Sequence, residues 1–279
     1  MLDDEALRAL GEQLVTVPGV LGVMLGGSRA RGDHDAASDV DLGLYYRPPL
    51  DTTALRALAR SVAGARSGIA EPEITEPGEW GPWVDGGGWL TIEGMPVDWI
   101  YRDLDRVRRS AELAAAGEFA YHFQVGHPFG FPDVGYAGEV ALGVVLADST
   151  GELSRLKQQL EPYPEALGRA MVRRLAEARF LLGVLPKPAH RSDTTYVAGC
   201  LFRVVTLCAY AVHGRAGRWV TNEKGIIDAA DRLAGAPAGF GRRAHGILAQ
   251  LGTEPQQLLT AIDGARALVD DVEAGVRVR

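Results

Sequence analysis

The spacing of apolar side chains over the first 62 residues switches between helical and strand-like patterns. Leucines at helical spacing over residues 2–14 predict an amphipathic helix that ends before Pro18-Gly19. The apolar run of residues 20–25 has the length of a strand, and residues 39–44 alternate polar and apolar side chains as a half-buried strand does. A second amphipathic helix is predicted over residues 55–62.

Residues 71–101 carry the signals of a loop followed by a hairpin. Gly, Pro and acidic residues are frequent over residues 71–88, which predicts a short strand and a loop. Residues 89–93 and 97–101 are joined across Gly94 and are predicted to pair as an antiparallel hairpin.

From Pro164 onward the pattern is helical throughout. One apolar stripe contains Leu167, Met171, Leu175 and Leu182, and further helices are predicted over residues 197–212, 226–233, 247–251 and 258–269. Short Gly/Pro connections between them favour an antiparallel bundle. The predicted fold class is therefore α/β (α+β), with a domain of strands and helices at residues 1–150 and a C-terminal α-helical bundle at residues 151–279.

Composition agrees with a soluble protein of two domains. The 279 residues are 47% hydrophobic and 23% charged, which argues against global disorder. The net charge of −7 argues against non-specific nucleic-acid binding, so no nucleic-acid partner is expected. The apolar stretch of residues 197–212 contains Arg203 and is shorter than a membrane span, which predicts a buried helix and no membrane role.

The first residues and the cysteines favour a cytoplasmic location. Residues 1–5 lack the basic and apolar regions of a secretory signal. Cys200 and Cys208 lie about 12 Å apart along one predicted helix at 1.5 Å per residue, which is too far for a disulfide. We expect two reduced, buried thiols.

Asp39 and Asp41 are the first candidates for chemistry. Alternate side chains of a strand point to the same face, so the two carboxylates project together while Val40 and Leu42 face a core. Two adjacent anions repel unless a cation lies between them. Hard oxygen ligands with room for phosphate oxygens suit Mg²⁺, so the pair predicts both a metal and a nucleotide.

The residues before this strand offer a phosphate site. Residues 26–32 are predicted to form a glycine turn followed by a short helix. Gly27, Ser28 and Arg31 are the candidates for nucleotide binding there. No Gly-Lys-Ser/Thr follows, so the loop is not of the Walker type.

The sequence Gly27-Ser28-x10-Asp39-Val40-Asp41-Leu42 resembles the signature of the DNA polymerase beta-like nucleotidyltransferase superfamily. The resemblance implies that superfamily's small mixed sheet and a third carboxylate on a neighbouring strand, for which Asp98 is the candidate and Glu93 the alternative. Asp98 would then bind metal or accept the proton of the acceptor hydroxyl.

Two other segments are similar to antibiotic nucleotidyltransferases of the aminoglycoside and lincosamide type. Residues 136–153 resemble the end of their catalytic domain, where Glu139 lies at the place of an acceptor-side carboxylate that acts as base in some relatives. Residues 218–225 resemble the region from which a lysine, here Lys224, reaches across the cleft between the domains to the triphosphate.

The resemblance implies transfer of an NMP, AMP from ATP, to a hydroxyl of a small molecule such as an aminoglycoside, with Mg²⁺ bound by Asp39, Asp41 and Asp98. The expected partners are the NTP and the acceptor, and a homodimer is compatible with this function. Two alternatives stay open. One is a protein-modifying or antitoxin-type nucleotidyltransferase that adds AMP to a protein hydroxyl, and the other is a non-catalytic nucleotide-binding protein.

Overall fold

The computed structural model describes residues 2–32, 38–63 and 73–277 of the chain. It divides into two compact units. The first contains Met1–Leu113 and Ala120–Pro162, and the second contains Ala114–Phe119 and Tyr163–Arg279. Each unit is described by itself below.

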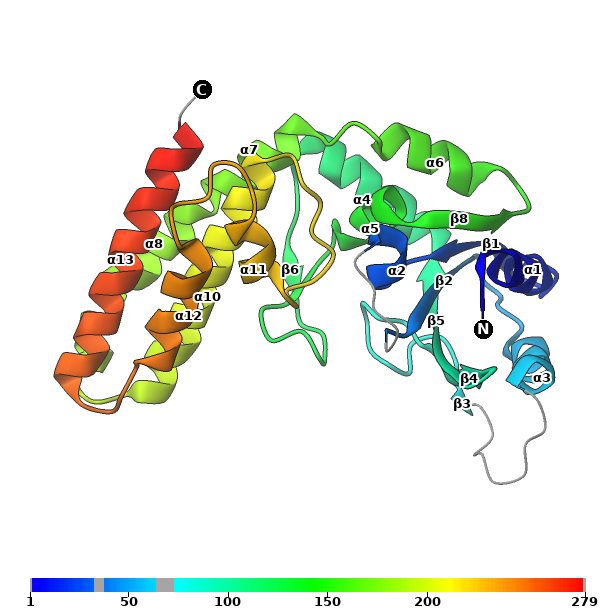
Figure 1. Cartoon of the computed structure of the whole chain (residues 1–279), viewed down its shortest axis with the longest axis horizontal. Helices are drawn as coiled ribbons and strands as arrows, with labels where there is room; N and C mark the ends of the chain where they lie inside the picture. Colours follow the sequence, from blue (N-terminus) through cyan, green and yellow to red (C-terminus); the bar gives the residue numbers. More distant parts are fainter. Residues whose placement is uncertain (1, 33–37, 64–72, 278–279) are drawn as a thin grey trace. The chain divides into compact units, whose positions relative to one another are not determined.

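The first unit is built on a six-stranded mixed sheet with strand order β3-β4-β5-β2-β1-β8 (Figure 1). Strands β2 and β5 are parallel, and the other neighbours are antiparallel. The strands are β1 Val20–Leu25, β2 Val40–Tyr46, β3 Glu73–Ile74, β4 Gly87–Ile92, β5 Met95–Asp103 and β8 Val144–Asp148. The predicted strands of residues 20–25 and 39–44 and the hairpin across Gly94 are confirmed.

One face of this sheet carries the main apolar core. Leu42, Leu44 and Trp99 are fully buried there, together with leucines of α1 (Asp4–Leu14) and α3 (Thr52–Ala63). The α1 helix begins where the Asp3 carboxylate accepts a hydrogen bond from the amide of Ala6 at 2.9 Å, which satisfies one of the unpaired amides of the first turn.

The other elements of the first unit follow β5 in the sequence. They are α4 Leu104–Ala116, the small hairpin of β6 Tyr121–His122 with β7 Phe131–Pro132, α5 Gly135–Leu142 and α6 Glu152–Leu160. Leu153 of α6 packs so closely on β1 that a Cβ placed on Gly22 would lie 2.8 Å from Leu153 Cδ2. The α6 helix therefore packs within the first unit, which extends to Pro162.

The second unit is helical. Its helices are α7 Glu165–Arg173, α8 Leu175–Val184, α9 Pro186–His190, α10 Thr194–Arg215, α11 Ile226–Asp231, α12 Phe240–Ala249 and α13 Pro255–Arg277. The apolar stripe predicted from Leu167 to Leu182 is divided between helices α7 and α8. The chain turns between them at Arg174, whose amide donates a hydrogen bond to the Met171 carbonyl at 3.1 Å. Helix α9 was not predicted.

Helix α10 is the central helix of this unit. In the part of the chain that the structure describes, it alone has the length and composition to cross a membrane, and 61% of its apolar window is buried, as in the core helix of a soluble protein. Cys208 is buried and Cys200 half-buried on this helix, both as free thiols. Arg203 pairs with Glu177 of α8, so the charge within the apolar pattern has a carboxylate partner.

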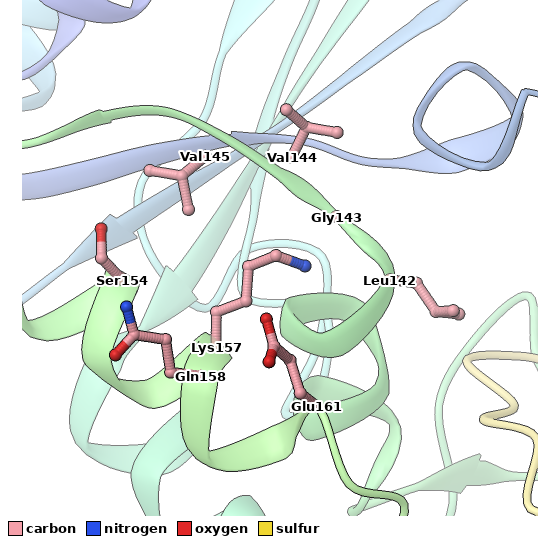
Figure 2. A pocket seen from close by; sticks show the side chains of 8 residues that line it. All are labelled: Leu142, Gly143, Val144, Val145, Ser154, Lys157, Gln158 and Glu161. Carbon is pink, nitrogen blue, oxygen red and sulfur yellow. The ribbon is translucent and has the colours of Figure 1, made fainter.

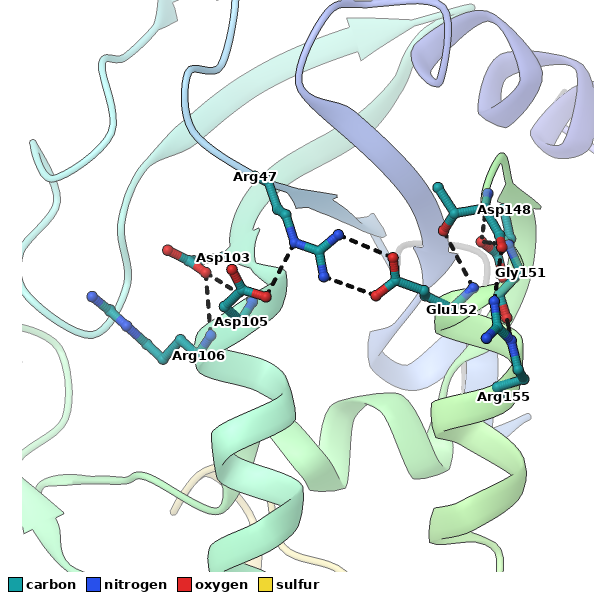
Figure 3. Close-up of polar contacts among 9 residues, drawn as sticks. Arg47, Asp103, Asp105, Arg106, Asp148, Gly151, Glu152 and Arg155 are labelled. Carbon is teal, nitrogen blue, oxygen red and sulfur yellow. Dashed lines mark hydrogen bonds and ion pairs between the residues drawn. The ribbon is translucent and has the colours of Figure 1, made fainter.

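Polar contacts tie α6 to the sheet in the first unit (Figure 3). Arg47, which follows β2, donates two hydrogen bonds to the Glu152 carboxylate at 2.8 and 3.0 Å and one to Asp105 at 3.1 Å. The Asp148 carboxylate accepts bonds from the amides of Gly151 and Ser154, both at 2.8 Å, and so fixes the start of α6. The hydrogen bonds from Arg47 hold the pKa of Glu152 below its ordinary value.

Replacement of Glu152 by Gln should therefore destabilise the protein in a pH-dependent way. Because the carboxyl pKa is lower in the folded than in the unfolded state, the pair stabilises the fold above about pH 5 and loses this effect as the pH falls through the folded pKa. We expect the free energy of unfolding to drop by about 1 kcal/mol at pH 7 and by less at pH 3, measured by urea unfolding. Glu165→Gln, which removes an exposed helix pair with Arg169, is the control. An equal loss at both pH values would contradict this account.

Candidate active site

Three carboxylates converge at one end of the sheet. Strands β2 and β5 pair in parallel with Asp41 directly beside Asp98, and Asp39 lies two residues before Asp41. Carboxylate oxygens of Asp39, Asp41 and Asp98 all lie within 4.8 Å of one another. Asp41 and Asp98 are half-buried, whereas Asp39 is exposed. Among the described residues no second group of acidic, histidine or cysteine side chains converges in this way.

The glycine turn is shaped by the Asp41 side chain. Gly27 opens helix α2 (Gly27–Arg31) with a φ of +61°, and a Cβ at this position would lie only 1.7 Å from Asp41 Oδ2. The amide of Gly26 donates to the Asp41 carbonyl at 2.8 Å. Any residue larger than glycine would displace the carboxylate, so the turn and the strand require each other. Ser28 is half-buried and Arg31 exposed on the same short helix.

Arg29 holds the backbone that leads into the strand. Its Nε donates to the Asp39 carbonyl at 3.1 Å, and its Nη2 donates to the Ser38 carbonyl at 2.9 Å. The guanidinium thus fixes the main chain at Asp39 while it leaves the carboxylate of that residue to other partners. Sequence analysis did not identify Arg29, because its acceptors are backbone carbonyls nine and ten residues away, and such contacts depend on no particular residue type.

Glu139 lies in an ion pair within the first unit rather than in the group of three carboxylates. It projects from α5 and accepts two hydrogen bonds from Arg102, at 2.5 and 2.7 Å. Arg102 is only 6% exposed; burial opposes its charge, but the Glu139 carboxylate keeps the pKa of Arg102 above its ordinary value. Arg102 lies four residues after Asp98 on β5, so both point to the same face of the sheet. Arg102 could have been identified from the sequence, because a charged residue four positions after Asp98 in a mostly buried strand needs a charged partner.

The other two predicted residues lie elsewhere. Glu93 occupies the tight turn between β4 and β5 with a φ of +52°, and it is exposed. Lys224 is exposed in the second unit, just before α11, where its amide donates to Asn222 Oδ1 at 2.9 Å. Contact between Lys224 and a triphosphate stays a prediction.

A separate hollow lies at the outer edge of the sheet (Figure 2). It has a volume of about 440 Å³ and is formed by the end of α5, the start of β8 and one side of α6. Lys157 crosses it, and its Nζ donates to the Ala141 carbonyl at 2.9 Å. None of the three carboxylates lines this hollow, so it is not part of their site.

Part of the chain is similar to known proteins. The family model described as a nucleotidyltransferase domain matches residues 5–76, which include the glycine turn, Asp39 and Asp41. Two proteins of Shewanella sp., strains ANA-3 and MR-7, both named deoxyguanosinetriphosphate triphosphohydrolase-like protein, are 37% identical over 78 residues. The match covers 26% of this chain and 16% of each relative, so the chain spans about a sixth of their length.

One solved structure, a nucleotidyltransferase-like protein from Exiguobacterium sibiricum 255-15, aligns over 98% of this chain and 78% of its own, with 14% identity and a TM-score of 0.43. The family match shows that residues 5–76, within the first unit, are similar to a nucleotidyltransferase domain. It supports the predicted superfamily. The mixed sheet followed by C-terminal helices confirms the predicted fold class.

Replacement of Gly27 by Ala tests the fit between the turn and Asp41. The added Cβ should displace the Asp41 carboxylate and weaken Mn²⁺ binding at least about tenfold, since a misplaced ligand loses more than about 1.4 kcal/mol of metal affinity. Binding can be measured by calorimetry or by electron paramagnetic resonance. Gly32→Ala is the matched control, because Gly32 also has a positive φ (+75°) but nothing within 4 Å of an added Cβ. Equal Mn²⁺ affinities of the two variants would contradict the fit.

Proposed function

We propose that the protein is a Mg²⁺-dependent nucleotidyltransferase that moves an NMP, AMP from ATP, to a hydroxyl of a small molecule and releases pyrophosphate. The observation that carries the proposal is the convergence of Asp39, Asp41 and Asp98 beside the turn at Gly27. A site of this kind positions a nucleoside triphosphate and a divalent cation together.

The three carboxylates fit a divalent cation. Their oxygens are close enough to repel one another strongly, and a cation between them would offset this repulsion. Carboxylate oxygens are hard ligands, and Mg²⁺ characteristically binds few of them and completes its shell with water and phosphate oxygens. When bound, the cation would neutralise charge on the phosphate oxygens. Asp39, Asp41 and Asp98 would hold it.

The turn would hold the nucleotide. The Ser28 hydroxyl and the backbone amides around Gly27 are suited to phosphate oxygens, and the Arg31 guanidinium adds positive charge on the same helix. Lys224 is proposed to neutralise the leaving pyrophosphate, on the strength of its sequence context alone.

Asp98 is the general base that we favour. It would accept the proton of the acceptor hydroxyl as the hydroxyl oxygen bonds to the α-phosphorus, and the bond from the α-phosphorus to the bridging oxygen of the β-phosphate would break. Glu139 is less suited to this role, because both of its oxygens accept hydrogen bonds from Arg102. Glu93 lies in the turn beyond the paired residues of β4 and β5.

We propose a cytoplasmic location for the protein. The proposed acceptor is a cationic small molecule of the aminoglycoside type. A net charge of −7 favours encounter with a cation. The superfamily resemblance supports this acceptor class. The negative charge of the site's carboxylates is also compatible with a cationic acceptor.

Asp41→Asn and Asp98→Asn should each reduce transfer to below a tenth of the wild-type rate, because each ~1.36 kcal/mol of lost transition-state stabilisation is tenfold in rate. The assay is pyrophosphate release with Mg²⁺, each of the four NTPs, and a panel of aminoglycosides, lincosamides and nucleosides. Asp263→Asn, an exposed carboxylate of α13, is the control and should keep full activity.

Retention of more than a tenth of the rate in either active-site variant would refute the assignment of that carboxylate. Nucleotide label found on a protein rather than on any small molecule would favour the protein-modifying alternative. Tight ATP binding without pyrophosphate release under any condition would favour the non-catalytic one.

A further inference from the structure

An exposed tryptophan lies beside the third carboxylate. Trp89 on β4 pairs directly with Asp98 on β5, so the two side chains lie on the same face of the sheet with Cβ atoms about 5 Å apart. The side chain of Trp89 is 59% exposed. A large aromatic residue that stays exposed next to a row of functional carboxylates suggests a surface for a ligand.

A second indole enlarges this surface. Trp80 stacks on Trp89 with ring centroids 4.6 Å apart and planes 20° from parallel. It also lies over Gly87 of β4, where an added Cβ would be 3.1 Å from Trp80 Cη2. The two indoles therefore form one aromatic platform, defined here as Trp80 and Trp89.

Hydrogen bonds from the buried Gln124 side chain hold the loop that carries Trp80. Gln124 is only 3% exposed, and its Nε2 donates to the Trp80 carbonyl at 2.8 Å. Its Oε1 accepts from the amides of Trp83 and Val84 at 2.9 and 3.1 Å. A buried side chain amide that makes three bonds to one loop fixes the loop before any ligand arrives, which lowers the entropic cost of binding.

A carboxylate lies on the far side of the platform. Glu73 of β3 pairs directly with Trp89, so Asp98, Trp89 and Glu73 form a row across three neighbouring strands on one face. Glu73 is exposed, and it has no ion-pair partner in the ranges that the structure describes. An indole face beside a carboxylate attracts an organic cation through both the ring quadrupole and the opposite charge.

We propose that Trp89, Trp80 and Glu73 form the acceptor subsite, which takes a ring alcohol that carries a cationic amine. The ring would lie on the platform, its hydroxyl would face Asp98, and its amine would approach Glu73. This inference rests on the proposed function.

The strand order supports this division of the site. The Gly27 turn follows β1 and packs against Asp41 of β2, on one side of β5, whereas Trp89 of the platform lies on β4, on the other side of β5. Asp98 on β5 is thus flanked by the nucleotide residues on one side and by the platform on the other. An acceptor that stacks on the platform would reach Asp98 without competing with the triphosphate for space.

The test separates acceptor binding from nucleotide binding by calorimetry. First, the affinity for Mn²⁺ with a non-hydrolysable ATP analogue is measured for the wild type and for Trp89→Ala, Trp89→Phe and Glu73→Gln. The control is Phe180→Ala, which removes an aromatic residue of the second unit that is also more than half exposed. Second, the affinity of each ternary mixture for kanamycin, a cationic aminosugar, is compared with that for the neutral trisaccharide maltotriose.

We expect Trp89→Ala to weaken kanamycin binding at least about tenfold and Glu73→Gln about threefold to fivefold, with Trp89→Phe and Phe180→Ala close to the wild type. Maltotriose should bind more weakly than kanamycin, and the Mn²⁺-nucleotide affinity should be the same in all variants. Unchanged kanamycin binding in Trp89→Ala, or no kanamycin binding by a wild type that binds Mn²⁺ and nucleotide, would overturn the subsite. Absence of Mn²⁺-nucleotide binding in the wild type would instead overturn the proposed function itself.

Discussion

The parallel pairing of β2 with β5 is the constraint on which the site depends. Because side chains alternate between the faces of a strand, a shift of one residue in this pairing would turn Asp98 toward the core and Trp99 toward the carboxylates. The apolar face prevents that shift, since Leu42 and Trp99 are buried as direct neighbours. The core therefore does more than stabilise the domain. It sets which polar side chains meet on the other face.

The face of β2 and β5 opposite the apolar core carries two separate groups of charged side chains. At one end three carboxylates lie together. Four residue pairs further along the same strands Tyr45 lies beside Arg102, whose guanidinium is neutralised by Glu139. Burial raises the pKa of the Tyr45 phenol, so this side chain stays neutral between the two charged regions. The Arg102 ion pair satisfies its own charges, whereas the three carboxylates bring like charges together at the other end of the strands. A cation bound among the carboxylates would offset their mutual repulsion.

Local patterns in the sequence predicted most of the first unit, because period-2 and period-3.6 spacing record burial directly. The pairing of Asp98 with Asp41 required the superfamily resemblance, since no local pattern states which strands are neighbours. Arg29, Gln124 and the stacking of Trp80 on Trp89 were not predicted, because each depends on contacts between segments that are distant in sequence or on backbone atoms that carry no residue identity. The packing of α6 against the sheet was not predicted for a similar reason. The apolar residues of α6 have the spacing of a bundle helix, and only the contact of Leu153 with β1 assigns that helix to the sheet.

The position of β5 between β2 and β4 has a consequence for how such a protein can change. Apart from Lys224 and the shared Asp98, the residues assigned to the nucleotide lie before residue 42. Those assigned to the acceptor lie between Glu73 and Asp98, so most of the two tasks is encoded in separate stretches of the gene. The segment that matches the family model, residues 5–76, contains nearly all of the first set and only Glu73 of the second. Substitutions on β4 and its flanking loop can therefore alter the choice of acceptor while the nucleotide half stays intact. Selection on one substrate need not disturb the other, and this arrangement favours evolutionary diversification of the acceptor.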